Sequence, residues 1–76
     1  MRDKTFKIVS QTLGLPVDGI SEKLASSSCE EWDSIKHMDL MFALEESFDV
    51  EFNEEQMIKM VNVKEILETL NSISSS

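Results

Sequence analysis

The chain has 76 residues, of which 41% are hydrophobic, and its 15 acidic and 7 basic residues give a formal net charge of −8. This length predicts one small domain, close to the lower limit at which a single core is self-sufficient. The acidic excess argues against nucleic acid or an anionic membrane as a direct partner. No stretch approaches the roughly 20 apolar residues of a transmembrane helix, and the N-terminus lacks the apolar core of a signal peptide.

Cys29 is the only cysteine, so the sequence predicts no intrachain disulfide and a reducing compartment. We therefore expect a cytoplasmic protein, and we separately expect a monomer. The acidic residues are concentrated in residues 29–55, which contain ten of them and a single lysine. This concentration fits either charge that keeps the protein in solution or a docking surface for basic partners.

A first helix is predicted from about Asp3 to Leu13, because apolar residues recur there at helical spacing and Gly14 supplies a stop. The apolar stripe consists of Phe6, Ile8, Val9 and Leu13. Residues 14–32 then form a long connection, and a loop of this length in so small a domain tends to be functional. The residues expected to hold the connection to the core are Val17, Ile20 and Leu24.

Two further helices follow this connection. The second helix is predicted from Ser34 to Phe48. Asn53 and Gln56 have the spacing of a capping box at the start of a short third helix. The expected apolar contacts of this third helix are Met57, Ile58 and Met60.

Asn62 and Glu65 repeat the capping pattern at the start of a fourth helix. Its apolar residues keep helical spacing and are Val63, Ile66, Leu67, Leu70 and Ile73. Residues 72–76 are expected to fray. The sequence therefore predicts one all-α domain (1–76), a small four-helix bundle with a long loop between the first two helices and a short third helix.

The helix predicted over residues 34–48 is apolar on two faces. The face without acids is the core face, where each large buried side chain contributes about 1.5–3 kcal/mol. Its residues are Leu40, Met41, Ala43, Leu44 and Phe48. A second stripe lies among acids and consists of Ile35, Met38 and Phe42, with Asp39, Glu45 and Glu46 around it. Either the long connection covers this stripe, or the stripe docks an apolar, basic-rimmed partner, which we favour because acids are costly to bury.

Other site patterns fail. Ser34, His37 and Asp39 do not form a hydrolase triad, because Asp39 lies round the helix from His37 and the chain has no nucleophile elbow. We expect His37 at a helix edge, partly exposed. Residues 49–54 begin like a calcium loop but lack its turn glycine, and Cys and His spacings typical of metal sites are absent. We therefore predict no enzyme and no dedicated metal site, with weak cation binding to the acid cluster as the alternative.

The second predicted helix opens with Asp33-Ser34-Ile35, and residues 43–49 read Ala-Leu-Glu-Glu-Ser-Phe-Asp. These two segments resemble the acyl carrier protein family, in which Asp-Ser-Leu stands at the first position and the second segment follows at the same distance. The resemblance continues without a gap to Val63 and back to residues 13–15, so it covers the whole chain.

The resemblance implies a carrier and not an enzyme. A phosphopantetheinyl transferase would attach 4'-phosphopantetheine from coenzyme A to Ser34, and the thiol of this arm would carry an acyl group as a thioester. The helix N-terminus favours the negative phosphodiester, and we expect Asp33 to cap the helix, while the resemblance adds a role in transferase recognition.

The resemblance also makes the second stripe a docking surface for acyl-loading and acyl-transferring enzymes with basic patches. Its residues would be Ile35, Met38, Asp39, Phe42, Glu45 and Glu46. A groove between the second and third helices would shelter a short acyl chain. Its expected lining is Leu44, Phe52, Met57 and Met60, for which ordinary core packing is the alternative.

The segment before Ser34 departs from the pattern of fatty-acid-synthase carriers. Residues 30–32 read Glu-Glu-Trp in place of Leu-Gly and a small residue, and Ser26 stands where phenylalanine is usual. Trp32 could anchor the loop or flank the arm. The departures favour a free-standing carrier of a specialised pathway in fatty-acid, polyketide or related lipid biosynthesis. The alternatives are an aminoacyl or peptidyl carrier and an unmodified acidic helical adaptor.

Overall fold

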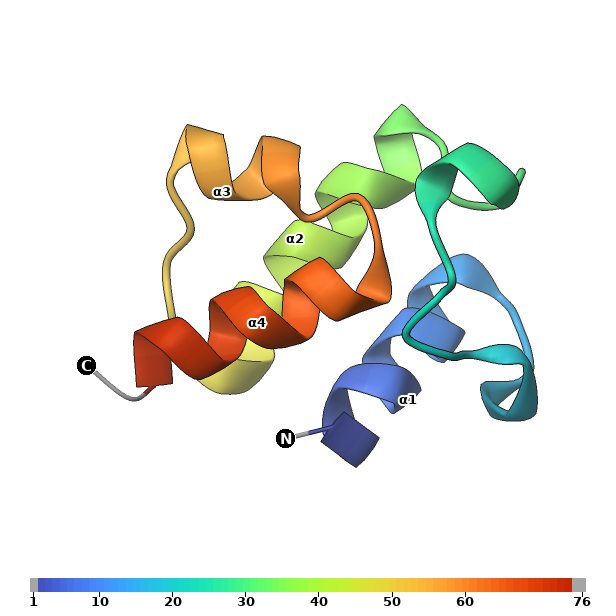
Figure 1. Cartoon of the computed structure of the whole chain (residues 1–76), viewed down its shortest axis with the longest axis horizontal. Coiled ribbons are helices and arrows are strands. Elements are labelled where there is room, and N and C mark those ends of the chain that lie inside the picture. Colours follow the sequence, from blue (N-terminus) through green and yellow to red (C-terminus); the bar gives the residue numbers. More distant parts are fainter. Residues whose placement is uncertain (1, 75–76) are drawn as a thin grey trace.

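The structure, a computed structural model, describes residues 2–74, and this part of the chain contains four α-helices (Figure 1). They are α1 (Arg2–Leu13), α2 (Ser34–Phe48), α3 (Glu54–Lys59) and α4 (Val63–Ser74). Two short 3-10 turns, η1 (Val17–Gly19) and η2 (Ser26–Ser28), lie between α1 and α2. The predicted all-α bundle, with its long first connection and short third helix, is confirmed. None of the helices in residues 2–74 is long and apolar enough to cross a lipid bilayer.

The first two helices end in left-handed residues. Gly14 has φ +73°, and its N–H donates to the carbonyl of Ser10 at 2.9 Å, which closes the last turn of α1. Glycine suits this position because it has no Cβ to clash in the left-handed region. Asp49 ends α2 in the same way, with φ 55° and its N–H bonded to the carbonyl of Glu45.

The two C-terminal helices begin at side-chain caps. Asn53 accepts from the N–H of Gln56 at 2.8 Å, and the Gln56 side chain accepts from the Asn53 N–H at 2.9 Å, so the predicted capping box is complete. Asn62 caps α4 by accepting from the N–H of Glu65 at 2.7 Å. The Glu65 carboxylate instead lies 3.7 Å from Lys59 Nζ, so the second cap contains one half of the box.

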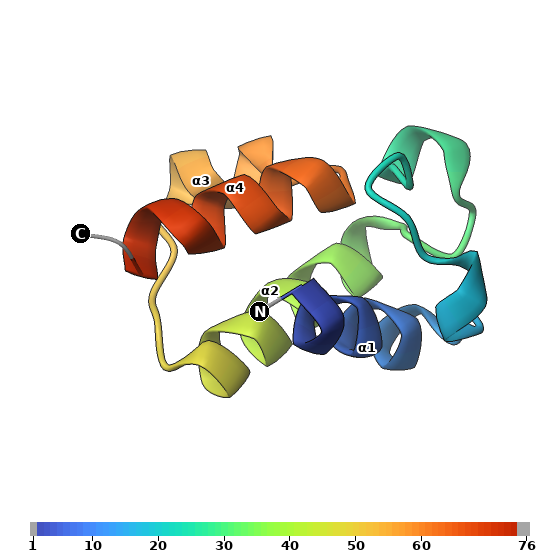
Figure 2. The same ribbon diagram turned by 60° about the horizontal axis from the view of Figure 1, so that its bottom comes forward.

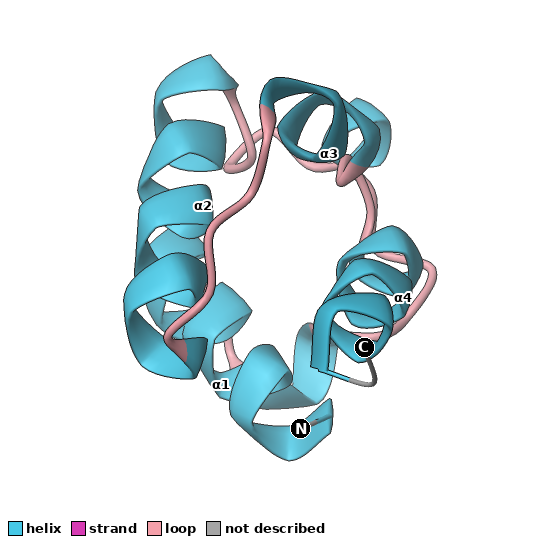
Figure 3. Ribbon diagram, turned by 90° about the vertical axis from the view of Figure 1, so that its left-hand side faces the viewer, coloured by secondary structure: helices cyan, strands magenta, loops and turns pink. Residues whose placement is uncertain are grey.

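The four helices surround a central space (Figure 3). The side chains of the hydrophobic core fill this space. α1 packs along α2 (Figure 2), and α4 closes the other side. The fully buried apolar residues include Val9, Leu40, Met41, Leu44, Met60, Val63 and Ile66. The predicted core face of α2 is therefore confirmed, with Ala43 and Phe48 partly buried at its margin.

The connection between α1 and α2 is tied to the start of α4. The N–H of Ser26 donates to the carbonyl of Val61 at 2.8 Å, and the N–H of Val63 donates to the carbonyl of Leu24 at 3.0 Å. Ile20 is 6% exposed and Leu24 packs against the core, as predicted. These bonds give η2 a fixed position beside the link between α3 and α4.

Three expectations from the sequence are wrong. Val17 is 51% exposed, because the η1 turn directs Ile20 inward and leaves Val17 on the surface. Ile58 is 68% exposed, because α3 is only six residues long and its inner side is taken by Met57 and Met60. Residues 72–74 continue α4 and are not frayed, since Ile73 packs against the core; residues 75–76 lie outside the described residues.

Candidate functional site

Ser34 is the first residue of α2, and its side chain is exposed. Asp33 precedes it in an extended conformation, and Asp33 Oδ1 accepts from the N–H of Lys36 at 2.8 Å. The predicted N-cap is thus confirmed. Because the cap uses Asp33, the Ser34 hydroxyl stands at the positive end of the helix dipole without serving as the cap itself.

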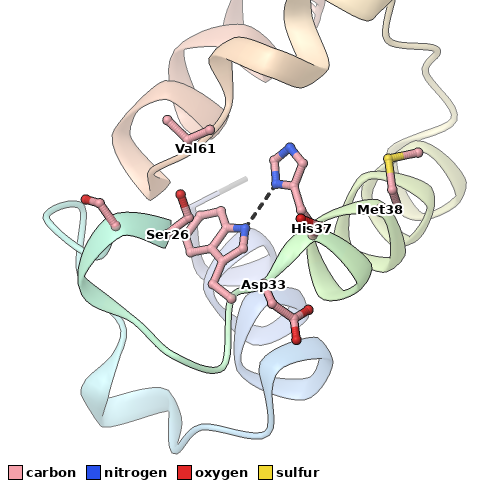
Figure 4. Close-up of a pocket in the computed structure, with 8 residues that line it drawn as sticks. Ser26, Asp33, His37, Met38 and Val61 are labelled. Atoms are coloured by element: carbon pink, nitrogen blue, oxygen red, sulfur yellow. Dashed lines mark hydrogen bonds between the residues drawn. The ribbon is translucent and has the colours of Figure 1, made fainter.

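A groove of about 540 Å³ borders Ser34 (Figure 4). Its volume lies within the range of about 300–1,000 Å³ typical of small-molecule sites. The groove is formed by η2, the start of α2 and the link between α3 and α4. Its lining residues are Ser26, Ser27, Trp32, Asp33, Ser34, His37, Met38 and Val61.

Trp32 and His37 join three segments at the wall of this groove. The indole Nε1–H of Trp32 donates to His37 Nδ1 at 3.0 Å, the dashed line in Figure 4. An indole N–H can only donate, so Nδ1 carries no hydrogen and the imidazole proton lies on Nε2. Nε2 in turn lies 2.7 Å from the carbonyl oxygen of Met57 and donates to it. The loop, α2 and α3 are therefore linked through one side chain.

The second apolar stripe of α2 is uncovered. Ile35 is 74% exposed, Phe42 is 56% exposed and Met38 is 41% exposed. The alternative that the long connection folds over this stripe is wrong, because the connection packs against the start of α4 instead. Ile35 follows Ser34 directly, and Met38 lies on both the stripe and the groove, so the two features adjoin.

The acids around the stripe have different roles. Asp39 and Glu46 are exposed. Glu45 is half-buried, and its Oε2 accepts from the N–H of Phe52 at 2.8 Å. This bond ties α2 to the segment before α3, so the Glu45 carboxylate holds the backbone of Phe52 as well as contributing charge. Nothing in the local sequence pattern indicates this role.

The residues predicted to shelter an acyl chain do not line the groove at Ser34. Leu44 and Met60 are fully buried, Phe52 is 6% exposed, and Met57 packs against the core. All four residues thus pack in or against the core, and sheltering of an acyl chain by them stays a prediction. Ser26, Ser27 and Val61 also line the groove without having been predicted as site residues, although the serine run is a visible signal in the sequence. Their contribution depends on the pairing of the connection with the start of α4.

In the described residues, no group of three or more His, Cys, Asp and Glu side chains is placed to hold a metal ion. No model of a known protein family matches the chain.

Proposed function

We propose that this chain is an acyl carrier protein. A phosphopantetheinyl transferase attaches phosphopantetheine from coenzyme A to Ser34, and the thiol of the arm carries acyl intermediates as thioesters. The carrier then presents them to partner enzymes of fatty-acid, polyketide or related specialised biosynthesis. The observation that carries this proposal is the position of Ser34, exposed at the start of a capped helix between a groove and an uncovered apolar stripe.

The surroundings of Ser34 suit a site that another enzyme modifies. A phosphodiester on Ser34 is stabilised by the N-terminal end of α2. Both ring nitrogens of His37 are engaged, one by Trp32 and one by Met57, so the imidazole is not free to take a proton from the serine. A carrier needs no such base, because the transferase supplies the chemistry.

The uncovered stripe suits docking to partner enzymes. Ile35, Met38 and Phe42 place apolar surface beside the modified serine, and Asp39 and Glu46 supply exposed negative charge next to it. A partner with an apolar patch and a basic rim complements both features, and such charges raise the rate of encounter and set selectivity. The stripe alone also suits an unmodified acidic adaptor. Attachment of phosphopantetheine to Ser34 therefore distinguishes the carrier from the adaptor.

The test is incubation with coenzyme A and a broad-specificity transferase, followed by measurement of the intact mass. We expect a gain of one phosphopantetheine group, which is absent in Ser34→Ala. Ser28→Ala, in an exposed serine of η2, is the matched control and keeps the gain. No gain, under conditions in which a known carrier is fully modified, would favour the adaptor.

A further inference from the structure

Two places near Ser34 are candidates for the cargo of the arm. One is the interior of the bundle between α2 and α3, and the other is the groove between η2 and Val61. The interior route runs along the face of α2 that Ser34 shares with His37, Met41 and Leu44, which follow at three- or four-residue spacing. His37 is therefore the first side chain between Ser34 and the core.

His37 occupies this route with two hydrogen bonds. Its Nε2 bonds to the Met57 carbonyl of α3 at 2.7 Å, so this side chain links α2 to α3 directly. Its Nδ1 is held by Trp32, which is 2% exposed and cannot turn away without losing a buried hydrogen bond. Opening the route would leave the indole N–H and the carbonyl without partners, at a cost that an alkyl chain must overcome.

The interior behind His37 is packed. Met41, Leu44 and Met60 are each fully buried in the core cluster. Protein cores are packed to the density of organic crystals, so a chain inserted there must displace these side chains. The hydrogen-bonded His37 side chain therefore opposes entry of an alkyl chain into the interior, and the packed core behind His37 opposes it as well.

The groove has a different chemistry. Ser26 lies on it together with the apolar side chains of Met38 and Val61 (Figure 4), and Ser27 adds a second hydroxyl side chain to the lining. Hydroxyls both donate and accept hydrogen bonds, so they favour binding of a ligand that carries a hydrogen-bonding group. A long alkyl chain gains little there, because an open groove removes only part of its apolar surface from water.

We propose that this groove, and not the interior of the bundle, holds the cargo, and that it takes a short acyl group with a hydrogen-bonding substituent, such as a hydroxyacyl or aminoacyl group. His37 is the residue that keeps the cargo out of the core. The inference rests on the proposed attachment of the arm to Ser34.

The test compares three cargoes on the wild-type protein. Butyryl, β-hydroxybutyryl and octanoyl coenzyme A are each used with a transferase to load Ser34, and the intact mass verifies the loading. Proton–nitrogen correlation spectra are then compared with the form whose thiol is free. We expect β-hydroxybutyryl to shift the signals of Ser26, Ser27 and the Trp32 indole more than butyryl does. We expect octanoyl to leave the amide signals of Leu44 and Met60 unchanged.

Each contrary result has a distinct meaning. Complete loading with octanoyl-dependent shifts at Leu44 and Met60 would place the cargo in the core and overturn the inference while the proposed function stands. Equal shifts for the hydroxylated and plain butyryl groups would overturn the selection for polar cargo. No mass gain would overturn the proposed function, and the inference with it.

A variant tests the role of His37. In His37→Ala we expect octanoyl to shift Leu44 and Met60, because the side chain between Ser34 and the core is gone. Lys36→Ala, which changes an exposed neighbour on the same helix, is the control and retains the wild-type pattern. An unchanged pattern in a folded His37→Ala would show that His37 does not exclude the chain. The wild-type spectra decide the location of the cargo even where this variant is too unstable to use.

Discussion

The indole of Trp32 donates to His37 Nδ1 at 3.0 Å, and this bond fixes which imidazole nitrogen faces Met57. A residue of the long connection thereby orients a side chain of α2, which in turn holds α3. Trp32 and His37 also stack, with ring centroids 6.2 Å apart and planes inclined by 26°. Both residues line the groove at Ser34, so their contact holds this part of its wall together.

A double-mutant cycle on this pair is expected to show coupling. Trp32→Phe keeps an aromatic ring but removes the donor, and we expect a loss of about 1–3 kcal/mol of unfolding free energy because buried polar groups lose a partner. Combination with His37→Ala should cost less than the sum of the two single changes, by about 0.5–3 kcal/mol. Urea unfolding followed by circular dichroism gives the unfolding free energies of the wild type, the two single variants and the double variant. Strict additivity would show that the bond contributes nothing to stability.

The cap of α2 is expected to depend on the side chain of Asp33. Asp33→Ala removes the acceptor for the Lys36 N–H and should lower the unfolding free energy by about 0.5–2 kcal/mol. Asp33→Asn keeps an acceptor and should retain most of the stability. Urea unfolding of the two variants against wild type is the measurement. Equal stability of Asp33→Ala and wild type would contradict the assigned cap.

Glu45 and Glu46 are neighbours with different expected effects. Glu46→Lys should leave stability unchanged and lower the transferase kcat/KM, with the loss shrinking as salt screens the charges. Glu45→Lys should in addition destabilise the fold by about 1–3 kcal/mol, because the Phe52 N–H loses its acceptor. Charge reversal is therefore expected to separate docking from stability at Glu46 but not at Glu45, whose carboxylate also holds the Phe52 N–H.

The control for this pair is Glu45→Gln, which removes the charge but keeps an oxygen as acceptor. It should recover most of the stability lost in Glu45→Lys. Identical unfolding free energies for Glu45→Lys and Glu46→Lys would contradict the role given to the Phe52 bond.

The two faces of α2 are expected to separate docking from stability. Ile35→Ala removes a side chain that is 74% exposed, so the unfolding free energy should change by no more than about 0.5 kcal/mol. The same change should lower the transferase kcat/KM by about fivefold or more, as loss of an interface anchor worth about 1 kcal/mol does. Leu44→Ala, on the core face, should instead cost about 2–5 kcal/mol of stability. Full transferase activity of Ile35→Ala would show that the stripe is not part of the surface that docks the transferase.

The helices could be predicted from the sequence because their signals are local. Apolar spacing defines the core face of α2, and short-range caps at Asp33, Asn53 and Asn62 define where three helices begin. Gly14 ends the first helix for an equally local reason, its left-handed conformation. The predicted exposure of Ile35 and its stripe also followed from helical geometry.

The groove could not be predicted in the same way, because its parts come from distant segments. Ser26 meets Val61 through backbone bonds that no periodicity encodes, and Trp32 meets His37 only once the connection has turned back to α2. Val17 and Ile20 are equally apolar in the sequence, and only the η1 turn determines which of them is buried.

The most direct test of the central claim is a peptide-level mass spectrum of the protein purified from its native host. Trypsin cleavage after Lys23 and Lys36 yields the peptide 24–36, which contains Ser34 together with the serines of η2. The account predicts this peptide with one phosphopantetheine group and places the group on Ser34. A peptide that is wholly unmodified, or modified on a serine of η2, would contradict it.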